Sequence, residues 1–233
     1  MKKYKLKLST ASLIAFISLR HFFHELHELM HMIVGRMYCG AWGTRDFNRV
    51  SPMPLGCKSE GLLQYLIGLE GPLFNFVMIW IGTILLKRSK SEQQASWGFA
   101  LIFASLPIAR LVTAIVGGGD ELGVALHSIS SPWIARVIII TLIFALIIYP
   151  IVLAYKTLDY RFKFLYILGF LFLPMILEGI VVLGFFNSLL AKGIYTEIWF
   201  MGMPKLVVIT LAVDIFILLI FGKNIKFLLK AHK

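Results

Sequence analysis

The sequence predicts an all-α fold, a polytopic transmembrane bundle of about six helical spans. Hydrophobic residues make up 59% of the 233 residues and charged residues only 15%, whereas a water-soluble domain carries roughly 25% charged residues. Six mostly apolar stretches approach the length of about 20 residues that a helix needs to cross a bilayer. The same composition excludes a disordered chain, because disorder requires low hydrophobicity.

The six predicted spans lie near residues 10–37, 61–86, 95–116, 132–155, 164–190 and 204–221. The chain begins with MKKYKLK and an apolar run, as a signal peptide does. No small-residue cleavage site follows, so we predict a retained span. The fifth and sixth spans each contain an acid, and for them a half-embedded arrangement stays open beside a full crossing.

The basic residues predict the orientation of the bundle in a cell membrane. With both termini on the cytoplasmic side, 14 Lys and Arg residues fall in the inside segments and five in the outside loops, as the positive-inside rule requires. The net charge of +11 is therefore attributed to topology and to contact with the lipid bilayer. Nucleic acid is excluded as a partner, because the charges cluster between apolar runs rather than along one face. Cys39 and Cys57 can form one disulfide if their loop faces an oxidising compartment.

The first span carries a dense cluster of ionisable residues in the segment RHFFHELHELMHMIVGR, residues 20–36. Such side chains are costly in a membrane helix and indicate function. His27, Glu28 and His31 fit the pattern His-Glu-x-x-His, in which two histidines on one helical face can bind one zinc ion. Glu28 lies beside that face, where it can take a proton from water bound to the metal. His24 leaves the pairs His24/His27 and His24/Glu28 open as ligands; we favour His27/His31 because a glutamate directly follows its first histidine.

Two histidines leave a catalytic zinc site incomplete, because it needs a third protein ligand and an open position. Asp120 and Glu121 follow the outer end of the third span, on the same side as the histidines. Glycines at 117–119 let the backbone leave helical geometry and approach the metal. We favour Asp120 as the third ligand, with Glu121, Glu178 and Asp214 as alternatives.

The remaining polar residues of the spans have other expected roles. His21 and Glu25 lie on the side of the first span that faces away from the predicted ligands. Glu178 and Asp214, in the fifth and sixth spans, are expected mainly as ion-pair partners of buried arginines. Asn75 follows a Gly-Pro pair that loosens the second span, and its amide can hold a substrate backbone or stabilise an oxyanion beside a metal.

The chain resembles the site-2 protease family of intramembrane zinc metalloproteases. The matching segments are HELMH at 27–31, GPLFN at 71–75 and LPIARLVTAIVGGGD at 106–120. The resemblance implies zinc bound by His27, His31 and Asp120, with Glu28 as the general base and Asn75 in contact with the substrate or the oxyanion. It also implies a β-hairpin in residues 38–61 that presents an extended substrate as an added strand.

The resemblance covers about residues 20–125 and includes departures from the family pattern. The chain has Met30 where the family usually has Gly, and Gly119-Asp120-Glu121 where it usually has Leu-Asp-Gly. The charge rule also places the site toward the outside, whereas the family more often opens toward the cytosol. We therefore expect one transmembrane domain over residues 1–233, with a divergent metalloprotease-like core at about 10–125 and additional spans over about 132–221.

The predicted activity is hydrolysis of peptide bonds of membrane proteins, within or near the bilayer, by a zinc endopeptidase. A transporter is the first alternative, since histidines on one helical stripe and acids in later spans can relay metal ions or protons. An inactive membrane scaffold with structural zinc is the second, and the intact Glu28 argues against it because a structural site needs no base. His/carboxylate sites accept several divalent ions, and zinc is the one that the motif favours.

Overall fold

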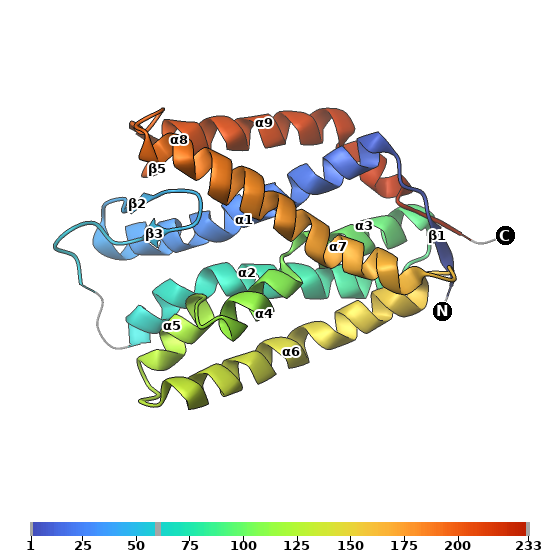
Figure 1. The fold of residues 1–233 in the computed structure, drawn as a ribbon, viewed down its shortest axis with the longest axis horizontal. Helices are drawn as coiled ribbons and strands as arrows, with labels where there is room; N and C mark the ends of the chain where they lie inside the picture. The colour runs from blue at the N-terminus through green and yellow to red at the C-terminus, as the bar shows by residue number, and fades with distance from the viewer. Residues whose placement is uncertain (1, 59–61, 232–233) are drawn as a thin grey trace.

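The computed structural model describes residues 2–58 and 62–231 and is mostly helical (Figure 1). The helices are, in chain order, α1 (Thr10–Cys39), α2 (Leu62–Lys87), α3 (Glu92–Ala104), α4 (Pro107–Ile115), α5 (Asp120–Leu126), α6 (Pro132–Thr157), α7 (Lys163–Glu178), the π-helix η1 (Gly179–Phe186), α8 (Asn187–Ala191), α9 (Lys205–Phe221) and the 3-10 helix η2 (Gly222–Phe227). Short antiparallel pairs join β1 (Tyr4–Leu6) to β6 (Leu229–Ala231), β2 (Thr44–Arg45) to β3 (Val50–Ser51), and β4 (Ile198–Phe200) to β5 (Met203–Pro204).

Within the described residues, five helical stretches are long and apolar enough to cross a membrane, which indicates a multi-pass membrane protein. They are Ile67–Lys87, Glu92–Ile115, Pro132–Thr157, Lys163–Ala191 and Lys205–Phe227. Each overlaps one of the second to sixth predicted spans. Large apolar side chains such as Trp133, Leu142 and Phe144 of α6 are exposed on the outside of the bundle, as lipid contact requires.

The predicted first span forms the 30-residue helix α1 but is not among the five apolar stretches. Its middle contains the charged residues Arg20, Glu25 and Glu28. By length and apolar composition alone, the number of membrane spans is therefore five within the described residues, where six were predicted. Other helices cover this polar middle: α1 contacts α2, α3, α7 and α9, and Figure 1 shows it running between α9 and α2. A helix enclosed by protein does not need the apolar surface of a helix that faces lipid.

Two of the predicted continuous spans are interrupted. The third is divided into α3 and α4 at Leu106, which has a left-handed backbone (φ 60°), and Pro107 begins α4. Proline suits the first position of a helix because its missing N–H would have no partner there. The fifth changes from α7 to the π-helix η1 after Glu178. Each interruption lies close to a polar residue inside the bundle. Arg110 follows Leu106 by one turn, and Glu178 directly precedes the π-helix.

The two ends of the molecule differ in character. At one end, β1 pairs with β6 (Tyr4 opposite Ala231), and Lys3 Nζ donates to the carbonyl of Lys156 at 2.8 Å. At the other end, the β2–β3 hairpin packs on α1 so closely that a Cβ on Gly35 would lie 2.1 Å from the Pro52 carbonyl oxygen. A disulfide joins Cys39 to Cys57 beside this hairpin. The structure thus contains the short hairpin and the disulfide that the sequence allowed.

The apolar core holds the first half of α1 in place. Phe16 of α1, Phe99 and Phe103 of α3 and Phe170 of α7 pack with ring centroids 4.7–5.6 Å apart. All four side chains are buried, and aromatic packing of this kind strengthens ordinary apolar burial. The first half of α1 is therefore anchored in the apolar core, and the polar half continues from it.

Candidate metal centre

Helix α1 brings the two predicted histidine ligands together. It begins with a capping box between Ser9 and Ser12 and ends at Gly40, whose left-handed backbone (φ 72°) closes the last turn. No proline interrupts it, so His27 and His31 lie one turn apart, with ring centroids separated by 5.0 Å. Both histidines are buried.

Asp120, the first residue of α5, approaches these histidines from a distant part of the chain. The backbone turns toward them at Gly117 and Gly119, whose φ values of 89° and 90° favour glycine. Asp120 Oδ2 then lies 3.2 Å from His27 Nε2 and 3.7 Å from His31 Nε2. The three residues each offer a ligand atom within 4.8 Å of the other two, a spacing that one metal ion can bridge.

The alternative acids have other partners. Glu121 accepts hydrogen bonds from Arg110. Glu178 pairs with Arg20, and Asp214 contacts His21 on the far side of α1. The structure therefore places Asp120, and none of these three acids, next to the His27/His31 pair.

The second ring nitrogen of each histidine is held by α2. His31 Nδ1 lies 3.2 Å from the carbonyl oxygen of Ile67, and Asn75 Nδ2 lies 3.0 Å from His27 Nδ1. Asn75 Oδ1 is buried and has no hydrogen-bond partner among the described residues. Rotation of this amide would let Oδ1 accept from His27 Nδ1–H and would leave the Nε2 lone pair for a metal. Asn75 is fully buried against His27, and its predicted contact with a substrate stays a prediction.

Two features fit a metal ion at this position. His31 Nε2 is buried without a hydrogen-bond partner in the described part of the chain, and an unpaired buried nitrogen is costly unless something binds it. Gly71 provides the space: a Cβ there would lie 2.5 Å from His31 Nε2 and 2.8 Å from His27 Nε2. Any larger residue would collide with the nitrogens that face Asp120.

Arg110 of α4 sets the charge beside Asp120. Its Nη2 donates to Asp120 Oδ2 at 2.7 Å, and it also pairs with Glu121. Burial by itself would raise the pKa of the Asp120 carboxyl, but its interactions with His27 and His31 and the charge of Arg110 hold that pKa well below its usual range. Asp120 is therefore a carboxylate, the form that binds metal.

Glu28 lies in the same cavity as the ligands. This cavity has a volume of about 370 Å³, and Glu28, His31 and Asp120 line it together with Val50 of β3 and the neighbouring Met53. Glu28 is mostly buried. The carboxylate predicted to act as a base thus shares an open space with two of the predicted ligands.

Several polar residues of this region were not predicted as part of the site. Glu70 lies 3.7 Å from His31 Nδ1, and the only signal for it was an acid within the apolar run LIGLEGPLFN. Arg110 is one of the arginines expected to pair with Glu178 or Asp214, whereas in the structure it pairs with Asp120 and Glu121. Arg45 of β2 pairs with Glu25 of α1, and no local pattern connects these two residues.

Comparison with protein-family models, with curated proteins and with solved structures finds no match for this chain.

Proposed function

We propose that this chain is a membrane-embedded zinc metalloprotease of the site-2 protease type, which hydrolyses peptide bonds of membrane proteins within or near the bilayer. The observation that carries the proposal is the meeting of His27, His31 and Asp120 in a buried setting, each with a ligand atom within 4.8 Å of the others. Two imidazoles and one carboxylate leave a fourth position open, as in catalytic zinc sites.

Zinc would be held by Nε2 of His27, Nε2 of His31 and the carboxylate of Asp120. When bound, zinc lowers the pKa of water to about 7 and polarises a carbonyl group. Asn75 and the Ile67 carbonyl fix the two rings through their Nδ1 atoms. Arg110 holds the Asp120 carboxylate in place.

Glu28 is the proposed general base and acid. It takes a proton from the attacking water and later delivers that proton to the nitrogen of the leaving amine. His24 Nε2 lies 3.2 Å from Glu28 Oε1, which orients the carboxylate within the cavity. In this proposal His24 contacts the general base and is not a ligand of this metal, consistent with the choice of His27 and His31 as the ligand pair.

The β2–β3 hairpin supplies a surface for an extended substrate. Val50, Pro52 and Met53 line the cavity that contains Glu28 and Asp120. Strand β3 pairs with β2 along one edge, and no other described strand pairs with it. Peptides commonly bind to such an edge as an added strand, and a substrate helix must unwind before its peptide bonds become accessible.

The orientation with both termini in the cytoplasm is supported by two independent features. The described ends of the chain pair with each other at the lysine-rich end of the molecule, the end that the positive-inside rule assigns to the cytoplasm. The Cys39–Cys57 disulfide lies at the opposite end, and disulfides persist on the oxidising side of a membrane. In this orientation α1 is the sixth membrane-crossing helix.

The test compares wild-type protein with Glu28→Gln in proteoliposomes that contain tagged transmembrane peptides. Loss of the base should lower cleavage by about 10²- to 10⁴-fold, while the zinc bound by His27, His31 and Asp120 is retained because Glu28 is not one of its ligands. Glu197→Gln, which removes an exposed acid, is the matched control and should cleave normally. Cleavage at the wild-type rate by Glu28→Gln would refute the mechanism.

A transporter is a second candidate, because acids from α7 and α9 contact histidines of α1 in the interior of the bundle. Ionisable groups of this kind can relay protons or ions. Zinc-dependent ion flux through proteoliposomes that persists in Glu28→Gln, without peptide cleavage, would favour this function over proteolysis.

A further inference from the structure

We propose that α1 carries a second divalent-cation site, formed by His21, His24 and Glu25 in the turns that precede the His27/His31 pair. These three residues each offer a ligand atom within 4.8 Å of the other two. They lie at positions i, i+3 and i+4 of one helix, a spacing that places side chains on a common face. The site does not depend on the proteolytic activity proposed above.

The buried atoms of this cluster that could bind a metal have few hydrogen-bond partners. His21 Nε2 and Glu25 Oε1 are buried without one among the described residues, and His24 Nδ1 contacts the Glu178 carboxylate. His21 Nε2 lies 3.7 Å from Glu25 Oε1, so the two atoms face each other across a short gap. Glu25 is 1% exposed, and leaving its oxygen unpaired is costly unless a proton or a cation binds there.

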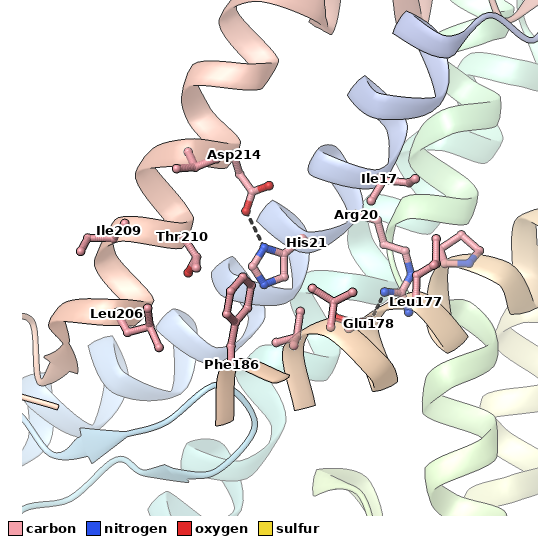
Figure 2. Close-up of a pocket in the computed structure, with 14 residues that line it drawn as sticks. Ile17, Arg20, His21, Leu177, Glu178, Phe186, Leu206, Ile209, Thr210 and Asp214 are labelled. Atoms are coloured by element: carbon pink, nitrogen blue, oxygen red, sulfur yellow. Dashed lines mark hydrogen bonds and ion pairs between the residues drawn. The ribbon is translucent and has the colours of Figure 1, made fainter. Parts of the chain in front are cut away.

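Each histidine is oriented through its other nitrogen by a carboxylate. His21 Nδ1 contacts Asp214 of α9 (Figure 2), and His24 Nε2 lies 3.2 Å from Glu28. A carboxylate behind a histidine fixes its tautomer and makes the remaining nitrogen a better metal ligand. The arrangement leaves His21 Nε2 and His24 Nδ1 as the two nitrogen ligands.

Glu178 is the fourth candidate donor. Its Oε1 lies 2.6 Å from His24 Nδ1, with which it pairs when the imidazole carries a proton, while its other oxygen pairs with Arg20. It is the last residue of α7, directly before the π-helix η1. π-helical turns are rare and occur frequently at functional sites.

The charges of the cluster favour a divalent cation. With neutral histidines, the four carboxylates exceed the two guanidinium groups by two negative charges. The carboxylates belong to Glu25, Glu28, Glu178 and Asp214, and the guanidinium groups to Arg20 and Arg45. Excess charge is expensive inside a membrane protein, and one divalent ion balances it. The competing arrangement is a proton on each histidine, without metal.

A cavity of about 420 Å³ between α1, α7, η1 and α9 adjoins the cluster at His21. His21, Glu178 and Asp214 line its inner wall, and apolar side chains such as Phe186 and Leu206 line the rest (Figure 2). Imidazole and carboxylate ligands suit zinc and other first-row divalent ions, so zinc is the probe we choose.

The test counts zinc ions bound to the full-length chain in detergent after removal of metal by a chelator. Calorimetric titration and elemental analysis should give two ions for the wild type. His21→Gln should give one, because glutamine keeps a polar contact with Asp214 but removes the imidazole. His27→Gln should also give one, and the double variant none. Ile17→Ala, one turn earlier on α1 and facing the same cavity, is the matched control and should keep both ions.

Either of two results would overturn the second site. The first is a wild-type chain that binds a single zinc ion, which is lost only in His27→Gln. The second is a His21→Gln chain that retains both zinc ions. Should His21→Gln elute as aggregated protein, Asp214→Asn replaces it and should weaken only the second zinc. Because the readout is the metal stoichiometry of the His21 and His27 variants, failure of the proposed protease would appear separately, as peptide cleavage that survives Glu28→Gln.

Discussion

The two polar faces of α1 use the same residue types in different surroundings. On the His27/His31 face, the group nearest to each Nδ1 atom is neutral, the Asn75 amide or the Ile67 carbonyl, and the Glu70 carboxylate lies farther away, 3.7 Å from His31 Nδ1. On the His21/His24 face, the rings are held by the carboxylates of Asp214 and Glu28. Neutral neighbours leave a bound metal more electrophilic, whereas anionic neighbours strengthen binding and weaken its Lewis acidity. The comparison suggests chemistry at the first face and retention or transfer of an ion at the second.

The faces also differ in where their third ligand originates. Asp120 reaches the first face from α5, 93 residues after His27, and the neighbouring cavity leaves room for a substrate. Glu25 comes from α1 itself, and its side chain is fully buried beside Arg45. A reactive centre needs access for its substrate, and only the first face combines ligands with a cavity lined by a strand edge.

The largest effect that separates the two faces is expected from Gly71→Ala. The new Cβ would lie 2.5 Å from His31 Nε2 and 2.7 Å from His27 Cε1, so both rings must move away from Asp120. We expect loss of zinc from the first face and of peptide cleavage, while the second face keeps its ion. Zinc titration of the purified variant measures this.

Gly169→Ala is the matched control for Gly71→Ala. It places the same methyl group in the interior of α7, where nothing lies within 4 Å of the new Cβ. It should therefore bind zinc as the wild type does. Two zinc ions bound by Gly71→Ala with unchanged affinity would contradict the geometry of the first face.

A smaller effect is expected from Asn75→Ala, which removes the amide beside His27 Nδ1. Loss of such a supporting group typically lowers metal affinity or activity by about 10- to 100-fold. The decrease should be confined to the first face. Thr83→Val, which removes a buried hydroxyl bonded only within α2, should leave zinc affinity unchanged. Equal weakening of both zinc ions by Asn75→Ala would show that the faces are not independent.

Sequence patterns predicted the features of the fold and of the candidate site that depend on local periodicity. Helical spacing placed His27 and His31 on one face, and the glycines before Asp120 indicated a backbone able to turn toward them. The apolar length rule found the later spans; α1 forms where the first span was predicted, although its composition alone does not mark it as a span, since a helix covered by other helices needs no apolar surface. The break at Leu106 and the π-helix after Glu178 interrupt long apolar runs without a change in hydropathy.

The second face could not be predicted because its contacts are long-range. His21 meets Asp214 across 193 residues, and Glu25 meets Arg45 across 20. Helix periodicity assigns a side chain to one face of its own helix, but it does not specify which residue of another element that side chain will contact. Helix periodicity therefore placed His21 and Glu25 away from the predicted ligands, where they do lie, but it gave no reason to connect them with Asp214, Arg45 or Glu178.

The smallest difference between the faces is expected when the Cys39–Cys57 disulfide is removed. The hairpin beside it contacts both faces: Arg45 of β2 pairs with Glu25, and Val50 of β3 lines the cavity of the first. A bridge across a separation of 18 residues typically contributes about 3 kcal/mol to the free energy of unfolding. Cys39→Ser with Cys57→Ser should lower the thermal unfolding temperature in detergent and weaken both zinc ions to a similar, small extent. Reduction of the wild type should reproduce the effect without a substitution. Weakening of one ion alone would contradict shared support and show that the hairpin supports a single face of α1.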